Sequence, residues 1–288
     1  MNLGIVILNY KTPELTVGCL RSVAGEIESL AKNCNCGLRA VVVDNFSNDD
    51  SVSRIATEIE TNGWSAWASV LPLSRNGGFA YGSNRGIENL GETDYFLVLN
   101  SDCVLHPGVL QRCVSVMESN LAIGAMSCAL QNPDGSLQTV ARRFPTPLRS
   151  AVSALGLPWL LPSLFAWANI EDPDWHRGTV KRDVDWLGGA FLFIRAAALA
   201  KTGPLDEEFF FYGEDVEFCY RLKKAHFSRH YDPAGRATHI GGASGGGDST
   251  QARREANYLV LRKCYGRWAQ TLVRGADHVA IALRGIKA

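Results

Sequence analysis

Short apolar runs alternate with helix-forming segments through the first part of the chain. The apolar runs are rich in β-branched residues, which is typical of strands in a parallel sheet. The first helix is expected to begin at Thr12-Pro13-Glu14, where a capping threonine precedes proline at the first helical position. We predict strands over 4–8, 38–43, 69–73 and 95–99, and helices over 13–30, 51–61, 82–90 and 107–119. This alternation indicates an α/β fold with a mostly parallel sheet.

The second half of the chain has a different pattern. A polar, turn-rich segment over 131–143 precedes an uncharged stretch over 151–170. That stretch is long enough to cross a bilayer, but Gly156, Pro158 and Pro162 interrupt it, so we expect a hydrophobic loop or broken helix. After it we predict a strand over 184–194 with a break at Gly188-Gly189, an aromatic strand over 209–212, a helix over 215–225, a glycine-rich segment over 238–247 and a long helix from 255 to about 283.

Polar side chains follow each of the four early strands. In parallel sheets ligands bind at the carboxyl ends of the strands, so these side chains are expected to converge on one crevice. The alternative is that Asn and Asp simply favour turns and caps. The residues concerned are Asn9, Asp44, Asn45, Arg75, Asn76, Asn100 and Asp102.

Three motifs carry candidate chemistry. Asn100-Ser101-Asp102 follows a buried strand and suits a divalent cation bound through oxygen, with an Asx-turn as the alternative. The glycine cluster over 76–84 allows the backbone to approach a ligand closely, and Arg75 could bind a phosphate. A plain turn explains these glycines equally well. Neither a Walker A motif nor a dinucleotide fingerprint after the first strand is present.

Glu214-Asp215 is the third motif, an acidic pair between an aromatic segment and a helix. Such pairs often only complement the helix dipole. Aromatic surroundings would raise the pKa of one of these carboxyls, as a general base requires. His239 precedes a glycine-rich segment and becomes a candidate ligand only if Asp102 lies nearby in space.

Composition and charge exclude several classes of protein. The 288 residues are 46% hydrophobic and 20% charged, which excludes wholesale disorder. The formal net charge is zero, which argues against a protein whose whole surface binds nucleic acid. The eight cysteines form no CxxC pair and are expected to be reduced and mostly buried. The amino terminus lacks a basic region and a cleavage site, so we expect a cytoplasmic protein.

Seven segments resemble family 2 glycosyltransferases, in particular their rhamnosyltransferase-like branch. In chain order they are IVILNY, VVVDNFSNDDS, NGGFAYGSNRG, YFLVLNSD, DWLGGAFLFIR, GPLDEEFFFYGEDVEFCYRL and PAGRATHIGGAS. The resemblance runs from Ile5 to about Ser244, and the stretch over 185–221 is the most specific part. In the general family pattern the metal motif has acids at both ends, whereas this chain has Asn100 at the first position, as this branch often does.

The resemblance implies a GT-A fold, a nucleotide-diphospho-sugar donor and an inverting mechanism. Asp215 is then expected to be the general base, with Glu214 beside it. Asp102 and His239 are expected to hold Mg2+ or Mn2+ against the diphosphate. The donor-binding residues that the resemblance implies are Asn9, Tyr10, Asp44, Asn45, Ser47, Arg75, Asn76, Gly78, Asn84, Asn100, Ser101, Trp186, Gly188 and Gly189.

No linker separates the two halves, so we expect one GT-A catalytic domain over 1–250. Residues 1–130 would form its nucleotide-sugar-binding half and residues 131–250 its acceptor and catalytic half. The basic helical extension over 251–288 carries eight Lys or Arg against two acids. Together with the apolar stretch it suggests peripheral contact with the inner face of a cell membrane. The alternatives are a core-covering loop with a solvated helix, or a homo-oligomer contact.

The expected reaction moves a sugar, with L-rhamnose from dTDP-L-rhamnose as the best choice, to a hydroxyl of a glycan or lipid-linked saccharide. Such a reaction belongs to polysaccharide and cell-wall biosynthesis. One alternative keeps the fold and uses a UDP-sugar. Two alternatives from other classes are a sugar nucleotidyltransferase and a non-catalytic module that binds nucleotide sugars.

Overall fold

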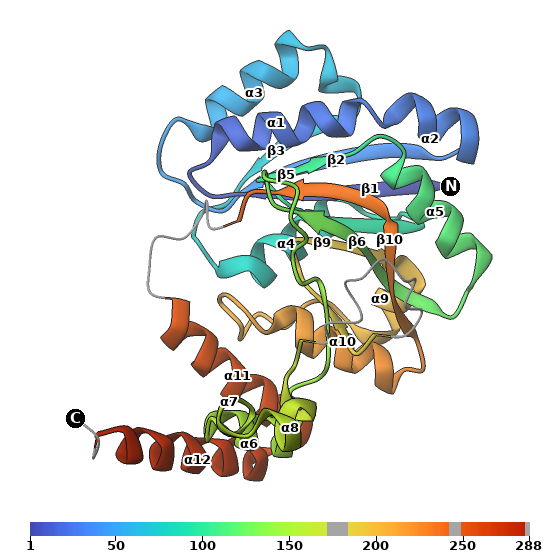
Figure 1. The fold of residues 1–288 in the computed structure, drawn as a ribbon. Helices are drawn as coiled ribbons and strands as arrows, with labels where there is room; N and C mark the ends of the chain where they lie inside the picture. Colours follow the sequence, from blue (N-terminus) through green and yellow to red (C-terminus); the bar gives the residue numbers. More distant parts are fainter. Residues whose placement is uncertain (172–183, 242–248, 286–288) are drawn as a thin grey trace.

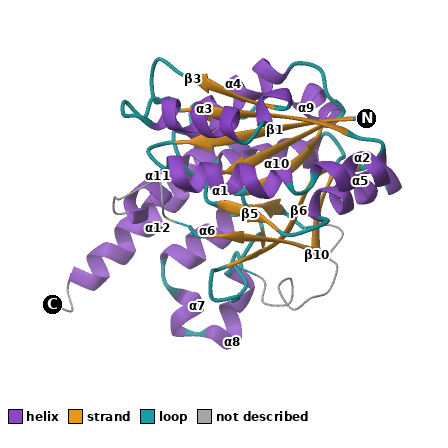
Figure 2. Ribbon diagram, turned by 90° about the horizontal axis from the view of Figure 1, so that it is seen from above, coloured by secondary structure: helices purple, strands orange, loops and turns teal. Residues whose placement is uncertain are grey.

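The computed structural model describes residues 1–171, 184–241 and 249–285 (Figure 1). A twisted central sheet carries helices on both faces, and further helices gather at one end of the molecule, away from the sheet (Figures 1 and 2). In Figure 1, α1 and α3 lie over one face of the sheet, and α4, α9 and α10 lie under the other.

The sheet has eight strands in the order β3-β2-β1-β4-β9-β6-β10-β5. Their bounds are β1 (Asn2–Asn9), β2 (Gly37–Asp44), β3 (Ala68–Pro72), β4 (Tyr95–Asn100), β5 (Cys103–Leu105), β6 (Ile123–Gln131), β9 (Phe191–Arg195) and β10 (Ser228–His239). The first four strands are mutually parallel, β10 is parallel to β6, and β9 runs antiparallel between β4 and β6. The predicted α/β fold with a mostly parallel sheet is therefore confirmed.

Helices connect these strands, and a small second sheet lies beside them. The helices around the main sheet are α1 (Pro13–Ala24), α2 (Ile27–Cys34), α3 (Ser51–Thr61), α4 (Gly78–Leu90), α5 (Val109–Ser119), α9 (Ala196–Thr202) and α10 (Glu214–Lys224), with a short 3-10 helix at Trp64–Ala66. The second sheet pairs β7 (Ala141–Arg142) with β8 (Trp186–Leu187). The expected break at Gly188-Gly189 is confirmed, because it separates β8 from β9 in different sheets.

A helical end completes the structure. It consists of α6 (Pro147–Ala154), α7 (Leu157–Leu160), α8 (Pro162–Phe165), a 3-10 turn at Ala166–Ala168, α11 (Ser249–Tyr265) and α12 (Arg267–Gly285). The broken helix expected over 151–170 is confirmed, with Pro158 and Pro162 in the first turns of α7 and α8. Ala151, Leu261 and Val273 belong to a separate small core that joins α6 to the two carboxyl-terminal helices. No helix among the described residues is both long and apolar enough to cross a membrane.

Three predicted elements were wrong. The single helix over 13–30 is two helices, because the buried carboxylate of Glu26 accepts hydrogen bonds from the backbone N–H groups of Gly108 and Leu110 and fixes a turn there. The long helix from 255 is also two helices, since Gly266 takes a φ of +97° that a helix does not allow. The aromatic segment over 209–212 is a turn rather than a strand.

The sequence also failed to predict two long strands, β6 and β10. The apolar residues of β6 are mostly alanine, methionine, cysteine and leucine, which are not the residues that mark strands. The polar sequence of β10 bulges between Asp232 and Arg236. The predicted glycine-rich segment over 238–247 begins at the end of β10, and residues 242–248 lie outside the described residues. All eight cysteines are free and seven are buried, which confirms that expectation.

Candidate active site

The carboxyl ends of β1, β2 and β4 bring the predicted polar residues to one edge of the sheet. Asn9 lies directly opposite Asp44 in the register of β1 and β2, and Asn100 lies opposite Leu8 in the register of β1 and β4. The prediction that strand ends converge on one crevice is confirmed for this part of the set. Ser47 is joined to Asp44 from the loop after β2, and Asn76 and Gly78 are joined to Asn45 from the loop before α4.

Asn9, Asp44 and Ser47 form a closed, buried hydrogen-bond group. Asn9 Nδ2 donates to Asp44 Oδ2 at 2.7 Å, and the Ser47 hydroxyl donates to the same oxygen at 2.6 Å. The Ser47 N–H donates to Asp44 Oδ1 at 3.0 Å. Three donors hold this buried carboxylate in one orientation at the end of β2, so it is a preorganised acceptor. Tyr10 follows Asn9 and is partly exposed at the start of the next loop.

The glycine-rich loop before α4 is attached to this group through Asn45. The Asn45 amide donates to Asn76 Oδ1 at 3.0 Å and to the Gly78 carbonyl at 3.1 Å. Gly78 has a φ of +88°, and a Cβ there would lie 2.1 Å from the Phe210 carbonyl oxygen. Only glycine permits this approach, so Gly78 locks the loop against the turn over 209–212.

Arg75 and Asn84 are placed differently. The Arg75 guanidinium lies over the Tyr81 ring at 4.5 Å, and the side chain is exposed. Asn84 is buried, donates to the Leu205 carbonyl at 2.9 Å and accepts from the Leu205 N–H at 3.0 Å. The polar atoms of Asn84 therefore tie α4 to the segment before α10.

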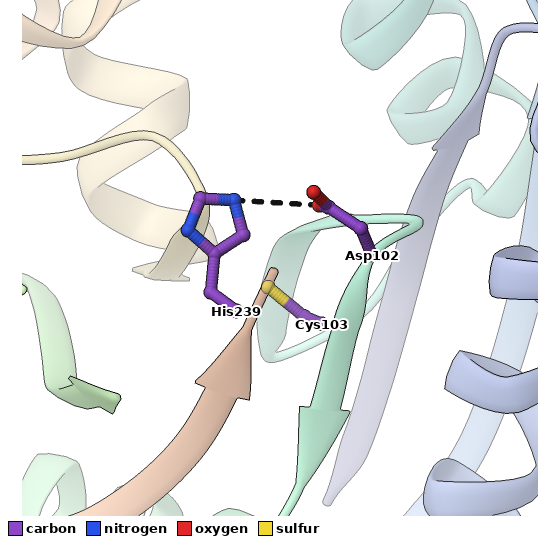
Figure 3. A group of neighbouring side chains, drawn as sticks. All are labelled: Asp102, Cys103 and His239. Atoms are coloured by element: carbon purple, nitrogen blue, oxygen red, sulfur yellow. Dashed lines mark ion pairs between the residues drawn. The ribbon is translucent and has the colours of Figure 1, made fainter. Parts of the chain in front are cut away.

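Asp102 and His239 meet at the second part of the site, as Figure 3 shows. Asp102 Oδ1 lies 3.3 Å from His239 Nε2, and the Gly241 N–H donates to Asp102 Oδ2 at 2.9 Å. Burial alone raises the pKa of Asp102, but His239 and the Gly241 N–H outweigh it, so the net pKa is lowered. Ser101, between Asn100 and Asp102, has its hydroxyl 3.0 Å from that of Thr12.

Gln138 fixes the tautomer of His239. Gln138 Nε2 donates to the His239 carbonyl at 2.7 Å and to Asn132 Oδ1 at 2.7 Å, so its Oε1 must be the acceptor that faces His239 Nδ1, 2.7 Å away. Nδ1 then carries the proton, and Nε2 is the atom that faces Asp102. With a proton on Nε2 the ring stabilises the ionised Asp102 carboxylate, and without that proton Nε2 has the lone pair that a metal ligand needs. Histidine metal ligands are commonly oriented by such a partner.

The Asp102 carboxylate suits Mg2+ or Mn2+, and the His239 imidazole is a common metal ligand that could join it. Cys103 lies near both groups, with one ligand atom from each of the three residues within 4.8 Å of the others (Figure 3). Burial raises the pKa of the Cys103 thiol well above its usual value, and Sγ donates to the Ala190 carbonyl at 3.4 Å. A buried neutral thiol does not bind a hard cation, so Asp102 and His239 are the fitting pair.

Glu214 and Asp215 form the third part of the site, at the start of α10. Asp215 is partly exposed, and its two oxygens accept from the N–H groups of Gly189 at 3.0 Å and Val216 at 2.8 Å. Glu214 is buried, and its Oε2 has no hydrogen-bond partner among the described residues. Burial is the largest cause that raises the pKa of both carboxyls, and for Glu214 the charge of Asp215 adds to it.

Two adjacent residues connect this acidic pair with the strand-end site. The Gly189 N–H holds Asp215, and the Ala190 carbonyl accepts from the Asn100 N–H at 3.0 Å. Consecutive Cα atoms lie about 3.8 Å apart, so the acidic pair is linked to the end of β4, where Asn100 Nδ2 lies 3.2 Å from His239 Nε2. This connection could not be read from the sequence, where Asn100 and Asp215 are far apart.

Trp186 and Gly188 lie just before Gly189 and Ala190 in the chain, and both are held by backbone carbonyls. Trp186 Nε1 donates to the Arg143 carbonyl at 2.9 Å, and the Gly188 N–H donates to the Val140 carbonyl at 2.9 Å. The Arg142 guanidinium lies 5.0 Å from the centre of the Trp186 ring, and its charge opposes the rise in the pKa of Asp215.

Sequence reasoning missed Gln138 and Arg142. Both lie in the polar, turn-rich segment over 131–143, which carried no motif. The only available signal was a concentration of polar side chains without a predicted strand to explain it.

Comparison with known proteins supports the expected family. The family model described as "Glycosyltransferase like family 2" matches residues 2–271. N-acetylglucosaminyl-diphospho-decaprenol L-rhamnosyltransferase of Mycobacterium tuberculosis is 28% identical over 228 residues, covering 75% of this chain and 73% of that protein. Rhamnosyltransferase WbbL of Escherichia coli (strain K12) is 28% identical over 170 residues, covering 56% of this chain and 60% of that protein.

The fold has solved relatives at low identity. The crystal structure of GalNAc-T7 with UDP, GalNAc and Mn2+ superposes with a TM-score of 0.65 at 14% identity. The match covers 90% of this chain and 48% of that one. This likeness shows the predicted GT-A fold. The family match sets aside the sugar nucleotidyltransferase and the non-catalytic module. The chain therefore belongs to glycosyltransferase family 2, and it is a glycosyltransferase similar to the rhamnosyltransferases of that family.

Proposed function

We propose that this glycosyltransferase transfers L-rhamnose from dTDP-L-rhamnose to a hydroxyl of a lipid-linked saccharide, with inversion at the anomeric carbon. One observation carries the proposal: His239 and the Gly241 N–H lower the pKa of Asp102, while burial raises the pKa of Asp215. Two carboxyls whose pKa values are shifted in opposite directions suit two different roles in one reaction.

Asp215 serves as the general base. The acceptor hydroxyl attacks the anomeric carbon as its proton passes to Asp215, and the bond from that carbon to the nucleoside diphosphate breaks in the same displacement. The Gly189 and Val216 N–H groups fix both carboxylate oxygens, so the base is oriented before substrate binds. Its partial exposure leaves a route for the acceptor, which the buried Glu214 lacks.

The opposite side of the site receives the donor. Asn9 and Ser47 fix the orientation of the Asp44 carboxylate. Asp44 accepts a hydrogen bond from the base of the nucleotide. Asp102 and His239 are the residues that would hold Mg2+ or Mn2+. When bound, such a cation neutralises the charge that develops on the leaving diphosphate. Arg75 carries a further positive charge that can turn toward the phosphates from its exposed position.

The choice of donor and acceptor rests on the relatives. Two curated relatives are named as rhamnosyltransferases, and the one from Mycobacterium tuberculosis is named for an N-acetylglucosaminyl-diphospho-decaprenol acceptor. An acceptor of that chemistry, a saccharide on a diphospho-lipid, is the one we propose here. Cell-wall or surface polysaccharide synthesis is the corresponding process.

Donor screening tests the proposal directly. Purified protein is incubated with Mn2+ or Mg2+, a diphospho-lipid-linked N-acetylglucosamine and, in separate reactions, dTDP-L-rhamnose, UDP-glucose, UDP-N-acetylglucosamine and UDP-galactofuranose. We expect nucleoside-diphosphate release and product only with dTDP-L-rhamnose, and an inverted anomeric configuration by NMR. Turnover with a UDP-sugar instead would overturn the donor assignment. Retention of configuration would overturn the role of Asp215.

A further inference from the structure

The exposed large apolar side chains of this protein are concentrated at the helical end. Eleven of the nineteen exposed large hydrophobic side chains among the described residues lie in 147–170 and in α12. These segments form a small part of the chain, so the concentration is not that of an ordinary soluble surface. We call these eleven side chains the apolar surface. It includes every exposed tryptophan of the described residues: Trp159, Trp167 and Trp268.

The loop helices α7 and α8 present their apolar residues without a partner. Trp159 is 85% exposed, and Leu160 and Leu164 are exposed as well. Neither helix has a buried residue, so these side chains do not contribute to the core. Each helix has four residues, whereas a bilayer-spanning helix needs roughly 20. Their geometry fits insertion into an interface.

Helix α12 has two apolar stripes side by side. Ala269, Val273 and Ala280 are buried against the rest of the helical end. Trp268, Leu272 and Val279 each lie one residue before a member of this buried stripe, so they have the same helical spacing, and all three are exposed. The first stripe explains why α12 folds back after Gly266. The second has no partner among the described residues.

The charges around this surface favour an anionic partner. Residues 147–170 contain no acid, and their one cation, Arg149, is partly buried and donates to the carbonyls of Phe144 and Trp167. On α12, Arg267 is exposed and forms no ion pair with the described residues, while Asp277 accepts a hydrogen bond from Tyr258 of α11. The single acid of α12 is thus turned toward the protein. Exposed tryptophan and leucine side chains beside an exposed arginine such as Arg267 are typical of helices that lie in a membrane interface.

Several of the cations that make the carboxyl-terminal extension basic are paired with acids in the structure. Arg262 and Lys263 form ion pairs with Glu208, and Lys263 also pairs with Asp206. Arg274 pairs with Glu255 at 3.1 Å. These cations attach the extension to the catalytic domain and to itself. Apolar contact is therefore the larger contribution, with charge adding to it.

We propose that the apolar surface docks this protein on an anionic lipid bilayer. Helix α11 belongs to this end (Figure 1) and packs against α10, the helix that begins with the acidic pair. Val260 of α11 lies against Gly213, the residue before Glu214, and the Arg253 guanidinium lies 4.5 Å from the centre of the Tyr212 ring. Docking at this end brings the base near the plane in which a lipid-linked acceptor lies. The purpose of the contact thus rests on the proposed acceptor, but the contact itself does not.

Vesicle flotation tests the docking without donor, metal or acceptor. The full chain is mixed with vesicles of phosphatidylglycerol and phosphatidylcholine, and with vesicles of phosphatidylcholine alone. We expect the protein to float with the anionic vesicles, and to float less with the neutral ones or at high salt. Failure to float with anionic vesicles overturns the proposal, whatever the transferase assay shows.

Matched variants locate the contact. Leu164→Ser combined with Trp159→Ser should lower vesicle partitioning by about tenfold or more, because two large apolar side chains no longer leave water. Trp268→Ser combined with Leu272→Ser should act in the same direction. Leu121→Ser is the control, since Leu121 is 71% exposed but lies between α5 and β6, and it should partition as the wild type does. Equal partitioning of all variants would contradict the assignment.

A second copy of the chain is the other occupant that an apolar surface admits. Light scattering of the wild type and of the Trp159→Ser, Leu164→Ser variant distinguishes the two. A monomer that floats supports the membrane contact. A dimer that the substitutions dissociate, without flotation of the wild type, overturns it in favour of a homo-oligomer interface. Circular dichroism and the thermal midpoint confirm that each variant is folded.

Discussion

Asp102 and Asp215 are carboxyls of one site whose surroundings shift their pKa values in opposite directions. Both are penalised by burial. At Asp102 the His239 ring and the Gly241 N–H overcome that penalty, and the pKa falls. At Asp215 the bonds from Val216 and Gly189 do not overcome it, and the pKa rises. The same residue type is thus prepared to hold a cation at one end of the site and to accept a proton at the other.

The two carboxyls have different partners, and only those of Asp102 outweigh burial. Asp102 faces an imidazole that Gln138 orients, whereas Asp215 is bonded by backbone N–H groups and follows a second, buried acid. Replacing either carboxyl, or a residue beside it such as Gln138 or Glu214, tests this comparison.

The largest effect is expected for Asp215→Asn. An amide cannot accept the proton of the acceptor hydroxyl, so we expect kcat to fall by about a thousandfold. Donor affinity in the presence of metal should remain, and calorimetry measures it. Glu214→Gln is the matched control and should retain most of the activity. Near wild-type turnover by Asp215→Asn would contradict the role of the base.

Removal of the other carboxylate should affect binding before chemistry. For Asp102→Asn we expect metal-dependent donor affinity to fall by about a hundredfold or more, since the loss of a ligand exceeds the loss of its supporting partner. Titration of donor with and without Mn2+ measures the change. The exposed Asp134 offers a control, because Asp134→Asn should leave donor affinity unchanged. Equal donor affinity with and without metal in the wild type would contradict the metal assignment.

Gln138→Leu should weaken metal binding by roughly tenfold, because the Nδ1 proton of His239 loses its acceptor and the ring can turn. The readout is the metal concentration that gives half-maximal donor binding. Gln138→Glu keeps an acceptor for Nδ1 and should restore part of the affinity. No change in either variant would mean that the ring is oriented by other contacts.

The pH profile compares the two carboxyls directly. As pH falls through the raised pKa of Asp215, the base becomes protonated and kcat/KM should fall with a slope of one. Because the pKa of Asp102 is lowered, the donor site should stay ionised through this range. We therefore expect the acid limb above the ordinary Asp range of about 3.5 to 4, with metal-dependent donor binding intact at the same pH. A limb within the ordinary range would contradict the assignment.

The smallest effect concerns stability at Glu214. Its folded-state pKa is raised, so it contributes to stability below its unfolded pKa, and this contribution is lost as pH rises toward the folded value. Glu214→Gln removes the dependence. We expect the variant to gain over the wild type by at most about 1.4 kcal/mol per pH unit in that interval. Urea unfolding at several pH values measures this, and a constant difference would contradict the buried protonated state.

Much of the fold could be predicted from the sequence because its first half forms regular alternating elements. The β-branched runs of β1, β2 and β4 and the proline at the start of α1 are local signals. The strands β6 and β10 were missed because neither shows these signals. Burial between other strands makes β6 a strand, and pairing with β6 makes β10 one.

The site residues divide in the same way. The motifs around Asp44, Asp102 and Asp215 could be identified from residue types at strand ends and a helix start. The proton position on His239 depends on Gln138, which lies 101 residues away in sequence. The link from Asp215 through Gly189 and Ala190 to Asn100 depends on β9 entering the sheet antiparallel beside β4.

The sequence by itself determined the alternation of strands and helices, the family and the residue types of the site, because those are local patterns. The tertiary structure decided which carboxyl is ionised and which favours its proton, since burial and distant partners set a pKa. It also decided which cations of the carboxyl-terminal extension form ion pairs. Net charge along a sequence is a sum, and only folding shows that Arg262, Lys263 and Arg274 are paired while Trp268 and Leu272 face solvent.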